Sequence, residues 1–312
     1  MRMVLNNRSV VLLMASMAML VSACSSGDEP EGVAGVRVVA TTTMLGDIAR
    51  NIVGDGGIVE VLLPIGADPH DYEPSSFQVS VIYDADLVIA NGLGLEEGLS
   101  DVLAGAADDE VNVVEVAVRV DPVSFDDREP CSTGARGICD PHVWLDPERA
   151  ASIALIVGTE LSLVDTSMDW QARAGLYAAE IRATDVTIDE MLASVPERDR
   201  ILVTNHDSLG YFADRFGLEI IGSVIPGGST LSEPSSADLA HLVDLIKETG
   251  VSAIFAEVAE PATLAEAIAS EVDHPVRVIP LFIGSLGDPG SGADTLIRML
   301  ETNAMLIADG LS

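Results

Sequence analysis

Three histidines lie in loops at the ends of expected secondary-structure elements. His70 follows an expected strand over residues 59–63, His206 follows one over residues 201–204, and His142 precedes an expected helix. Open α/β sheets bind ligands at the carboxyl ends of their parallel strands. Neutral imidazole is a good donor for a borderline divalent cation such as Zn²⁺. The three histidines together therefore predict one metal site, although a single loop histidine is more often a surface or turn residue.

Acidic side chains next to these histidines are candidates to orient their rings. Each histidine has a carboxylate within two residues of it, and such a partner commonly fixes a metal-binding imidazole. Since only neutral imidazole binds metal, we expect binding to weaken as the pH falls through about 6.5, the ordinary histidine pKa. The other two histidines, His241 in an expected helix and His274 before a proline, are expected to pack or to face solvent.

Short β-branched runs alternate with helical patterns along the chain, and the alternation occurs twice. Strands are expected over residues 37–40, 59–63, 87–90, 111–114, 201–204, 219–225, 253–256 and 276–281. Helices are expected over residues 44–53, 75–85, 147–163, from 168 to about 193, 209–216, 235–249, 262–270 and 292–311. This rhythm predicts two doubly wound α/β lobes with mainly parallel sheets. The helical segment between them predicts one long rigid linking helix and limited lobe closure.

The first residues have the features of an export signal. Arg2 and Arg8 precede an apolar run at residues 10–21 that is too short to cross a bilayer. The next residues are Val21-Ser22-Ala23-Cys24, which resembles a bacterial lipobox and implies cleavage before Cys24 and lipidation of its thiol. The alternative is an ordinary signal with a chance cysteine.

We divide the chain into five segments on this pattern. They are a lipoprotein signal peptide over residues 1–23, a flexible tether over 24–35, an N-terminal α/β lobe over 36–146, a helical segment with the long linking helix over 147–196, and a C-terminal α/β lobe over 197–312. The mature protein is expected at the extracytoplasmic face of a bacterial cell membrane, on the cell surface or in the periplasm.

Two further cysteines, Cys131 and Cys139, lie in a stretch rich in Ser, Gly, Asp and Pro. An exported protein sits in an oxidising compartment, so we expect a disulfide between them. The alternative is a pair of metal thiolates, because His142 follows Cys139 closely. The spacing of the two cysteines is not that of the usual zinc motifs.

The charge of the chain excludes one class of partner. With 16 Lys and Arg against 50 Asp and Glu, the formal net charge is −34. A nucleic-acid binder needs a basic surface, so nucleic acid is not expected as a partner. We expect a monomer in solution.

Several ordered motifs resemble the zinc- and manganese-binding solute-binding proteins of bacterial ABC importers. The resemblance covers residues 36–311 and rests on Pro69-His70-Asp71-Tyr72-Glu73-Pro74, Asp140-Pro141-His142-Val143-Trp144-Leu145-Asp146-Pro147, His206-Asp207-Ser208-Leu209-Gly210-Tyr211-Phe212-Ala213, Ile254-Phe255-Ala256-Glu257 and Gly284-Ser285-Leu286-Gly287. It implies two lobes bridged by a long helix, with one metal ion buried in the cleft. It also implies that His70, His142 and His206 are the ligands. A histidine at the third position is similar to the zinc-type members of the family.

One position departs from the family pattern. Many members have an acidic residue directly before the Ser-Leu-Gly segment, where it completes the site, and this chain has Gly284 there. Water, Asp288 or another carboxylate is then the candidate for the fourth donor. Glu257, at the end of an expected strand, is a candidate fourth ligand or a partner of a ligand.

The resemblance implies a function and leaves alternatives. We expect extracytoplasmic capture of a divalent transition metal, Zn²⁺ in the first place, and delivery to an ABC transporter permease, with a metallochaperone as a further candidate partner. Manganese or iron binding in the same transporter class is the alternative. A zinc-dependent hydrolase is a remote one, because the chain lacks the His-Glu-x-x-His and Gly-x-Ser-x-Gly signatures, and so is a surface adhesin or scaffold. We therefore expect no enzymatic activity.

Overall fold

The computed structural model describes residues 35–126, 128–131 and 138–312. The predicted signal peptide and Cys24 lie outside these ranges. The strands are β1 (Val36–Ala40), β2 (Gly57–Val61), β3 (Leu87–Ala90), β4 (Val113–Glu115), β5 (Ile201–Thr204), β6 (Glu219–Ser223), β7 (Ala253–Glu257) and β8 (Arg277–Leu281). The helices are α2 (Thr43–Val53), α3 (Ser76–Tyr83), α4 (Ser100–Asp108), α5 (Pro147–Val164), α6 (Trp170–Leu192), α7 (Gly210–Phe216), α8 (Ser236–Thr249), α9 (Thr263–Glu271) and α10 (Leu296–Gly310).

The strands form two parallel sheets with the same topology. The first sheet has the order β2-β1-β3-β4 and the second the order β6-β5-β7-β8. The first strand of each lobe thus lies inside its sheet, and the strand order reverses beside it, which is where α/β proteins place their ligands. The predicted pair of doubly wound α/β lobes is confirmed.

Each strand turns alternate side chains to two different cores, as the period of a strand requires. In β1, Val38 and Ala40 face the central core, whereas Val39 faces α3 and α4. In β7, Phe255 faces the central core and Ile254 faces α8 and α9. The central core is continuous and includes residues of both lobes, so the two sheets share one apolar interior.

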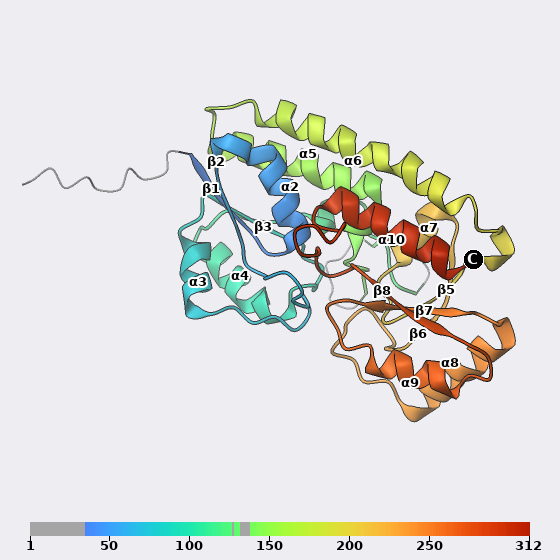
Figure 1. Ribbon diagram of the computed structural model, residues 1–312. Helices are drawn as coiled ribbons and strands as arrows, with labels where there is room; N and C mark the ends of the chain where they lie inside the picture. Colours follow the sequence, from blue (N-terminus) through green and yellow to red (C-terminus); the bar gives the residue numbers. More distant parts are fainter. Residues whose placement is uncertain (1–34, 127, 132–137) are drawn as a thin grey trace, which may run out of the picture. The chain divides into compact units, whose positions relative to one another are not determined.

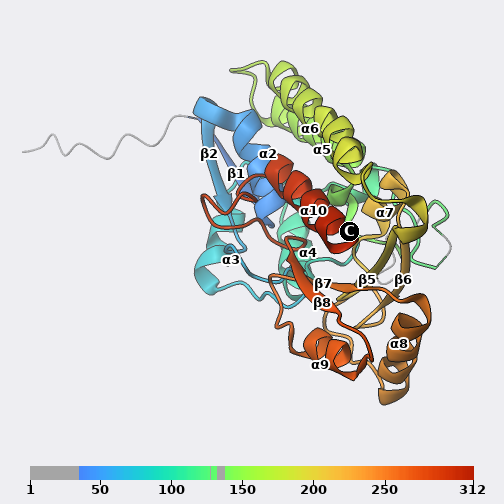
Figure 2. The same ribbon diagram turned by 45° about the vertical axis from the view of Figure 1, so that its right-hand side comes forward.

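Two long helices lie across the top of this shared core. Helices α5 and α6 run side by side along the length of the molecule (Figures 1 and 2). The 23 residues of α6 reach about 35 Å at 1.5 Å per residue. The last helix, α10, packs against α6 and α2, and its Leu296 N–H donates to Asp47 Oδ2 of α2 at 3.1 Å. The C-terminal segment is therefore fastened to the first lobe as well as to the second sheet.

Among the α-helices and strands of the described chain, α4 is the one that the sequence pattern did not predict. Its sequence contains Gly105 and three alanines, and only Leu103 and Ala106 are buried. A helix with so narrow an apolar stripe gives a weak periodic signal.

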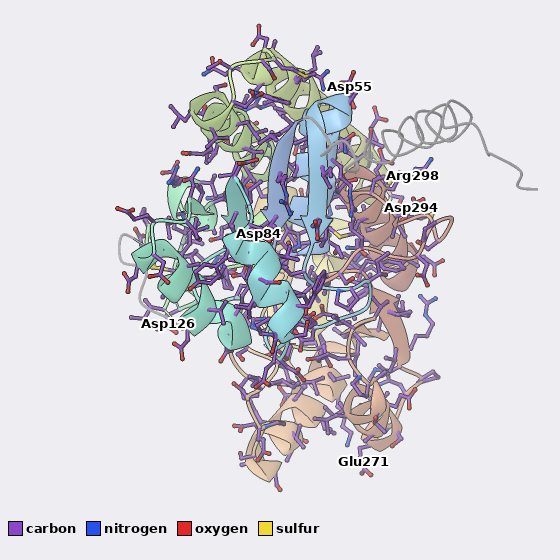
Figure 3. The ribbon with its side chains drawn as sticks, turned by 90° about the vertical axis from the view of Figure 1, so that its left-hand side faces the viewer. Asp55, Asp84, Asp126, Glu271, Asp294 and Arg298 are labelled. Carbon is purple, nitrogen blue, oxygen red and sulfur yellow. A yellow bond between two sulfur atoms is a disulfide. The ribbon has the colours of Figure 1, made fainter. Side chains whose placement is uncertain are left out.

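Many acidic residues lie on the outside of the fold, whereas Asp47, Glu96, Asp140, Asp146 and Glu257 are buried. Asp84, Asp126 and Glu271 project from different parts of the surface (Figure 3), where water solvates their charge. Within the described residues, no helix is both long and apolar enough to span a bilayer.

The contact between α5 and α6 generates a stability prediction. A Cβ added to Gly158 would lie 2.4 Å from the Ala174 Cβ and 2.9 Å from the Trp170 carbonyl oxygen. Gly158→Ala should therefore lower the free energy of unfolding by about 1–3 kcal/mol, because the helices have no room to separate. Urea unfolding followed by tryptophan fluorescence measures this change.

Gly175 provides the matched control, since it lies within α6 and an added Cβ meets nothing within 4 Å. Gly175→Ala should raise the free energy of unfolding by roughly 0.5–1 kcal/mol through helix propensity. Equal effects of the two substitutions would contradict this account of the helix pair.

Candidate metal centre

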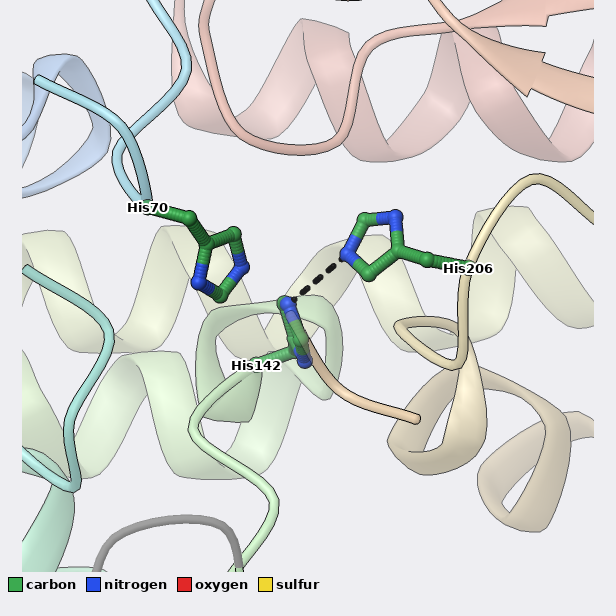
Figure 4. A group of neighbouring side chains, drawn as sticks. All are labelled: His70, His142 and His206. Atoms are coloured by element: carbon green, nitrogen blue, oxygen red, sulfur yellow. Dashed lines mark hydrogen bonds between the residues drawn. The ribbon is translucent and has the colours of Figure 1, made fainter. Parts of the chain in front are cut away.

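The three predicted histidines meet in one buried group (Figure 4). One ring nitrogen from each of His70, His142 and His206 lies within 4.8 Å of the others. The Nε2 atoms of His142 and His206 are 3.3 Å apart, and the ring centroids of the three pairs are 5.1–5.6 Å apart. All three residues are at least 97 % buried. The sequence separation of these residues shows that the fold, and not local structure, brings them together.

His70 is placed by the loop that follows β2. Its backbone N–H donates to Asp68 Oδ1 at 2.9 Å, which shapes the turn. Asp68 Oδ2 accepts a hydrogen bond from Thr230 Oγ1 at 2.6 Å, and the Gly66 N–H donates to Ser285 Oγ at 2.8 Å. Thr230 and Ser285 belong to the second lobe, so hydrogen bonds from that lobe hold the first-lobe loop that carries His70.

His142 is placed by the start of α5. The Asp146 side chain accepts the Glu148 N–H at 2.9 Å and caps the helix, which has Pro147 at its first turn. Trp144, two residues after the histidine, is buried and donates from Nε1 to the Ile283 carbonyl at 3.0 Å. The short connection between His142 and a capped helix therefore leaves its backbone little freedom.

His206 follows β5 directly. Thr204, the last residue of that strand, donates from Oγ1 to the His206 carbonyl at 2.8 Å. The next residue, Asp207, donates its N–H to the Gly227 carbonyl at 3.1 Å. The histidine therefore sits in a tight turn between a central strand and the loop after β6.

A carboxylate faces the Nδ1 atom of each ring. Asp140 Oδ1 lies 2.9 Å from His142 Nδ1, Glu257 Oε2 lies 3.4 Å from His206 Nδ1, and Glu97 Oε1 lies 3.7 Å from His70 Nδ1. Such partners orient imidazoles for metal binding through Nε2. Only Asp140 is a sequence neighbour of its histidine. The expectation that the nearest carboxylate in sequence would do this is wrong for His70 and His206, and Glu97 was not identified from the sequence.

Burial lowers the pKa of all three histidines, because the interior disfavours the protonated ring. For His142 and His206, neighbouring imidazoles lower the pKa further. Both ring nitrogens of His70 and Nδ1 of His206 are buried without a hydrogen-bond partner among the described residues. Leaving such an atom unpaired costs about 1–3 kcal/mol, and a divalent cation is the kind of partner that His70 Nε2 lacks.

Glu257 fills the space beside Gly284. A Cβ at Gly284 would lie 2.5 Å from Glu257 Oε1 and 2.8 Å from the Pro69 Cδ. Glu257 Oε1 occupies the place that a side chain at this position would need, and it accepts a hydrogen bond from the Gly284 N–H. Burial raises the pKa of Glu257 to about 8, and the nearby Asp68 charge adds to this shift. Gly284, which stands where many family members have an acidic residue, thus leaves space for the carboxyl group of Glu257 from β7.

The other predicted site residues lie apart from the histidines. Asp288 is exposed and does not belong to the group of potential ligands found among the described residues. Cys131 and Cys139 form a disulfide with their Cα atoms 5.7 Å apart, and neither belongs to that group. Metal binding by the two thiolates is therefore not supported.

A cavity of about 470 Å³ opens beside His70. Its lining includes Glu97 of the first lobe and Ser229 of the loop after β6. Ser229 Oγ donates to Glu97 Oε1 at 2.6 Å, so this loop of the second lobe is bonded to the carboxylate that faces His70. Of the three histidines, His70 lines this cavity.

Known proteins resemble this chain over nearly its whole length. The family described as "ZnuA: Zinc-uptake complex component A periplasmic" matches residues 38–310. Manganese-binding lipoprotein MntA of Halalkalibacterium halodurans is 28% identical, with 97% of each chain covered. The manganese ABC transporter lipoprotein PsaA of Streptococcus mitis is 26% identical, with 97% of this chain and 98% of that protein covered. The solved periplasmic zinc-binding protein TroA of Treponema pallidum is 29% identical, has a TM-score of 0.80, and is covered to 99% against 89% of this chain.

The raised pKa of Glu257 predicts proton release when metal binds at pH 7. The carboxyl holds a proton in the metal-free protein because its pKa is about 8, and a bound cation lowers that pKa. The histidines contribute little, since their pKa values lie below 6.5 and their rings are already neutral. Binding should release about one proton per chain from Glu257.

Calorimetry in buffers of different ionisation enthalpy counts these protons. Glu257→Gln should remove about one proton from the count, because the amide has none to release. An unchanged count in this variant would show that the protons come from the histidines or from other carboxyls.

Proposed function

Because the chain belongs to the zinc-uptake component A family, we propose that it captures Zn²⁺ outside the cytoplasm and delivers it to the permease of an ABC transporter. Capture of a divalent metal ion for ABC import is the function of this family of solute-binding proteins, and the chain is not an enzyme. The choice of zinc, the ligand roles of the residues and the lipid anchor are parts of the proposal.

The donor set is the observation that supports zinc. Three buried imidazoles converge, and no carboxylate of the described chain belongs to the same group of ligand atoms. Imidazole suits Zn²⁺, whereas manganese prefers carboxylate and water oxygens. His70, His142 and His206 are the proposed ligands, with water in the fourth position. Glu257 is proposed as the orienting partner of His206, since it faces Nδ1 and leaves Nε2 for the metal.

Manganese is the alternative cargo, and iron is a more distant one. The names of the relatives divide, since MntA and PsaA are named for manganese and TroA for zinc. Glu257 is the carboxylate that we propose as the oxygen donor in that case, because it is buried beside His206. The metal competition described below separates the two cargoes.

The anchor and the partners follow from the same assignment. Several relatives are named lipoproteins, which supports lipidation at Cys24 and a position at the outer face of the cell membrane. The permease of the transporter is the partner that the family implies. Loading by a metallochaperone stays a prediction.

Metal competition tests the proposed function. Protein beginning after Cys24, offered equal Zn²⁺ and Mn²⁺ and then dialysed, should retain about one zinc per chain, in line with the order of metal affinities. His70→Ala, His142→Ala and His206→Ala should each lower zinc affinity by more than the roughly 10–100-fold that losing an outer partner costs. Plasma mass spectrometry and a chelator competition measure content and affinity.

His241→Ala is the control, because His241 is exposed on α8 and does not belong to the group of potential ligands. It should leave zinc content unchanged. Retention of manganese, or zinc that survives all three ligand substitutions, would contradict the proposed site.

A further inference from the structure

Arg128 links Asp140, two residues before His142, to helix α7. Its Nη1 donates to Asp140 Oδ2 at 2.8 Å, and its Nε donates to Asp214 Oδ2 of α7 at 2.8 Å. The guanidinium also lies over the ring of Tyr211, 4.8 Å from its centroid. A Cβ at Gly210 would lie 2.5 Å from Nη1, so the start of α7 is shaped to admit this side chain.

The two oxygens of Asp140 have separate tasks. Arg128 occupies Oδ2, while Oδ1 accepts the backbone N–H of His142 at 3.0 Å and lies 2.9 Å from its Nδ1. The Asp140 side chain is completely buried. Arg128 holds Oδ2 through one charge-assisted hydrogen bond, which limits the rotation of the carboxylate whose Oδ1 meets the imidazole.

The disulfide fastens the segment that carries Arg128. The Cys131 N–H donates to the Pro122 carbonyl at 2.7 Å, and the Asp140 N–H donates to the Val123 carbonyl at 2.8 Å. The Cys131–Cys139 bond therefore joins the strand-like stretch after Arg128 to the stretch that enters the metal centre. Arg128 has a φ of 57°, a left-handed conformation that a non-glycine residue adopts only where its surroundings hold it.

We propose that Arg128 is a positioning residue for the metal centre, acting through Asp140 on His142, and that the Cys131–Cys139 disulfide holds Arg128 in place. Opening the disulfide therefore lowers metal affinity, although no sulfur binds the metal. This inference rests on the proposed function, since it takes His142 to be a ligand. It goes beyond that function in making the metal affinity of the site depend on whether the Cys131–Cys139 disulfide is oxidised.

The chemistry of the test is a two-electron reduction. A phosphine attacks one sulfur and breaks the S–S bond, and water supplies the oxygen of the phosphine oxide and the two protons of the thiols. Removing the phosphine by gel filtration without oxygen leaves the dithiol protein free of a competing ligand. Zinc affinity is then measured by competition with a chromophoric chelator, beside the thermal midpoint of the metal-free protein.

Four variants separate positioning from folding. Arg128→Gln should lower zinc affinity by about 10–100-fold, the usual cost of losing an outer partner of a metal ligand. Arg128→Lys should recover part of this loss, because it keeps one charged donor for Asp140. Asp214→Asn should leave affinity within a few-fold, since it breaks only the more exposed pair of Arg128. The Cys131→Ser/Cys139→Ser variant should match the reduced wild-type protein.

The decisive comparison is whether the loss of zinc affinity on reduction adds to the loss caused by Arg128→Gln. Reduction should weaken zinc binding in the wild type but hardly further in Arg128→Gln, because both changes remove the same contact. A gain of bound zinc on reduction would show that the thiols are ligands and overturn the inference. So would a lower thermal midpoint for Arg128→Gln with unchanged zinc affinity. If His142→Ala kept full zinc affinity, the proposed function itself would fail, whatever Arg128 does.

Discussion

The burial of three imidazoles without enough hydrogen-bond partners is the constraint on which this structure depends. His70, His142 and His206 come from different segments and converge within 4.8 Å. Their rings are almost fully buried, and several of their nitrogens have no partner among the described residues. Polar atoms are rarely left in that state in folded proteins. A cation bound at the Nε2 atoms would pair Nε2 of His70, while the carboxylates at Nδ1 direct the rings toward it. The stability of the folded site and its affinity for metal are therefore two aspects of one arrangement.

The frame around the histidines keeps this arrangement in place. The central apolar core runs through both lobes, and α5, α6 and α10 pack along it. Large separation of the lobes would expose part of that core, at about 25 cal/mol for each Å² of apolar surface. Metal entry by small movements near the cavity, where Ser229 and Thr230 bond the first lobe, costs much less. This favours a loop movement over the wide closure of proteins whose lobes are joined by flexible strands.

Much of the fold and the three histidines could be predicted from the sequence, because strand and helix periods are local and loop histidines at strand ends are conspicuous. Asp140 and Glu257 were candidates from the sequence, but Glu97 and the ring that each carboxylate faces could not be predicted. Asp140 is two residues from His142, whereas Glu97 and Glu257 reach His70 and His206 through the sheet topology. Glu257 likewise fills the space beside Gly284 only because two segments distant in sequence pack together. Long-range contacts of this kind leave no periodic signal in one sequence.

X-ray absorption at the zinc edge of the zinc-loaded protein tests the central claim most directly. Three imidazole nitrogens at about 2.0–2.1 Å from the metal, with one further oxygen donor, are the expected first shell. His142→Ala should reduce the imidazole count by one. Sulfur at about 2.3 Å, or a shell built from carboxylate oxygens with at most one imidazole, would contradict the account of a three-histidine site.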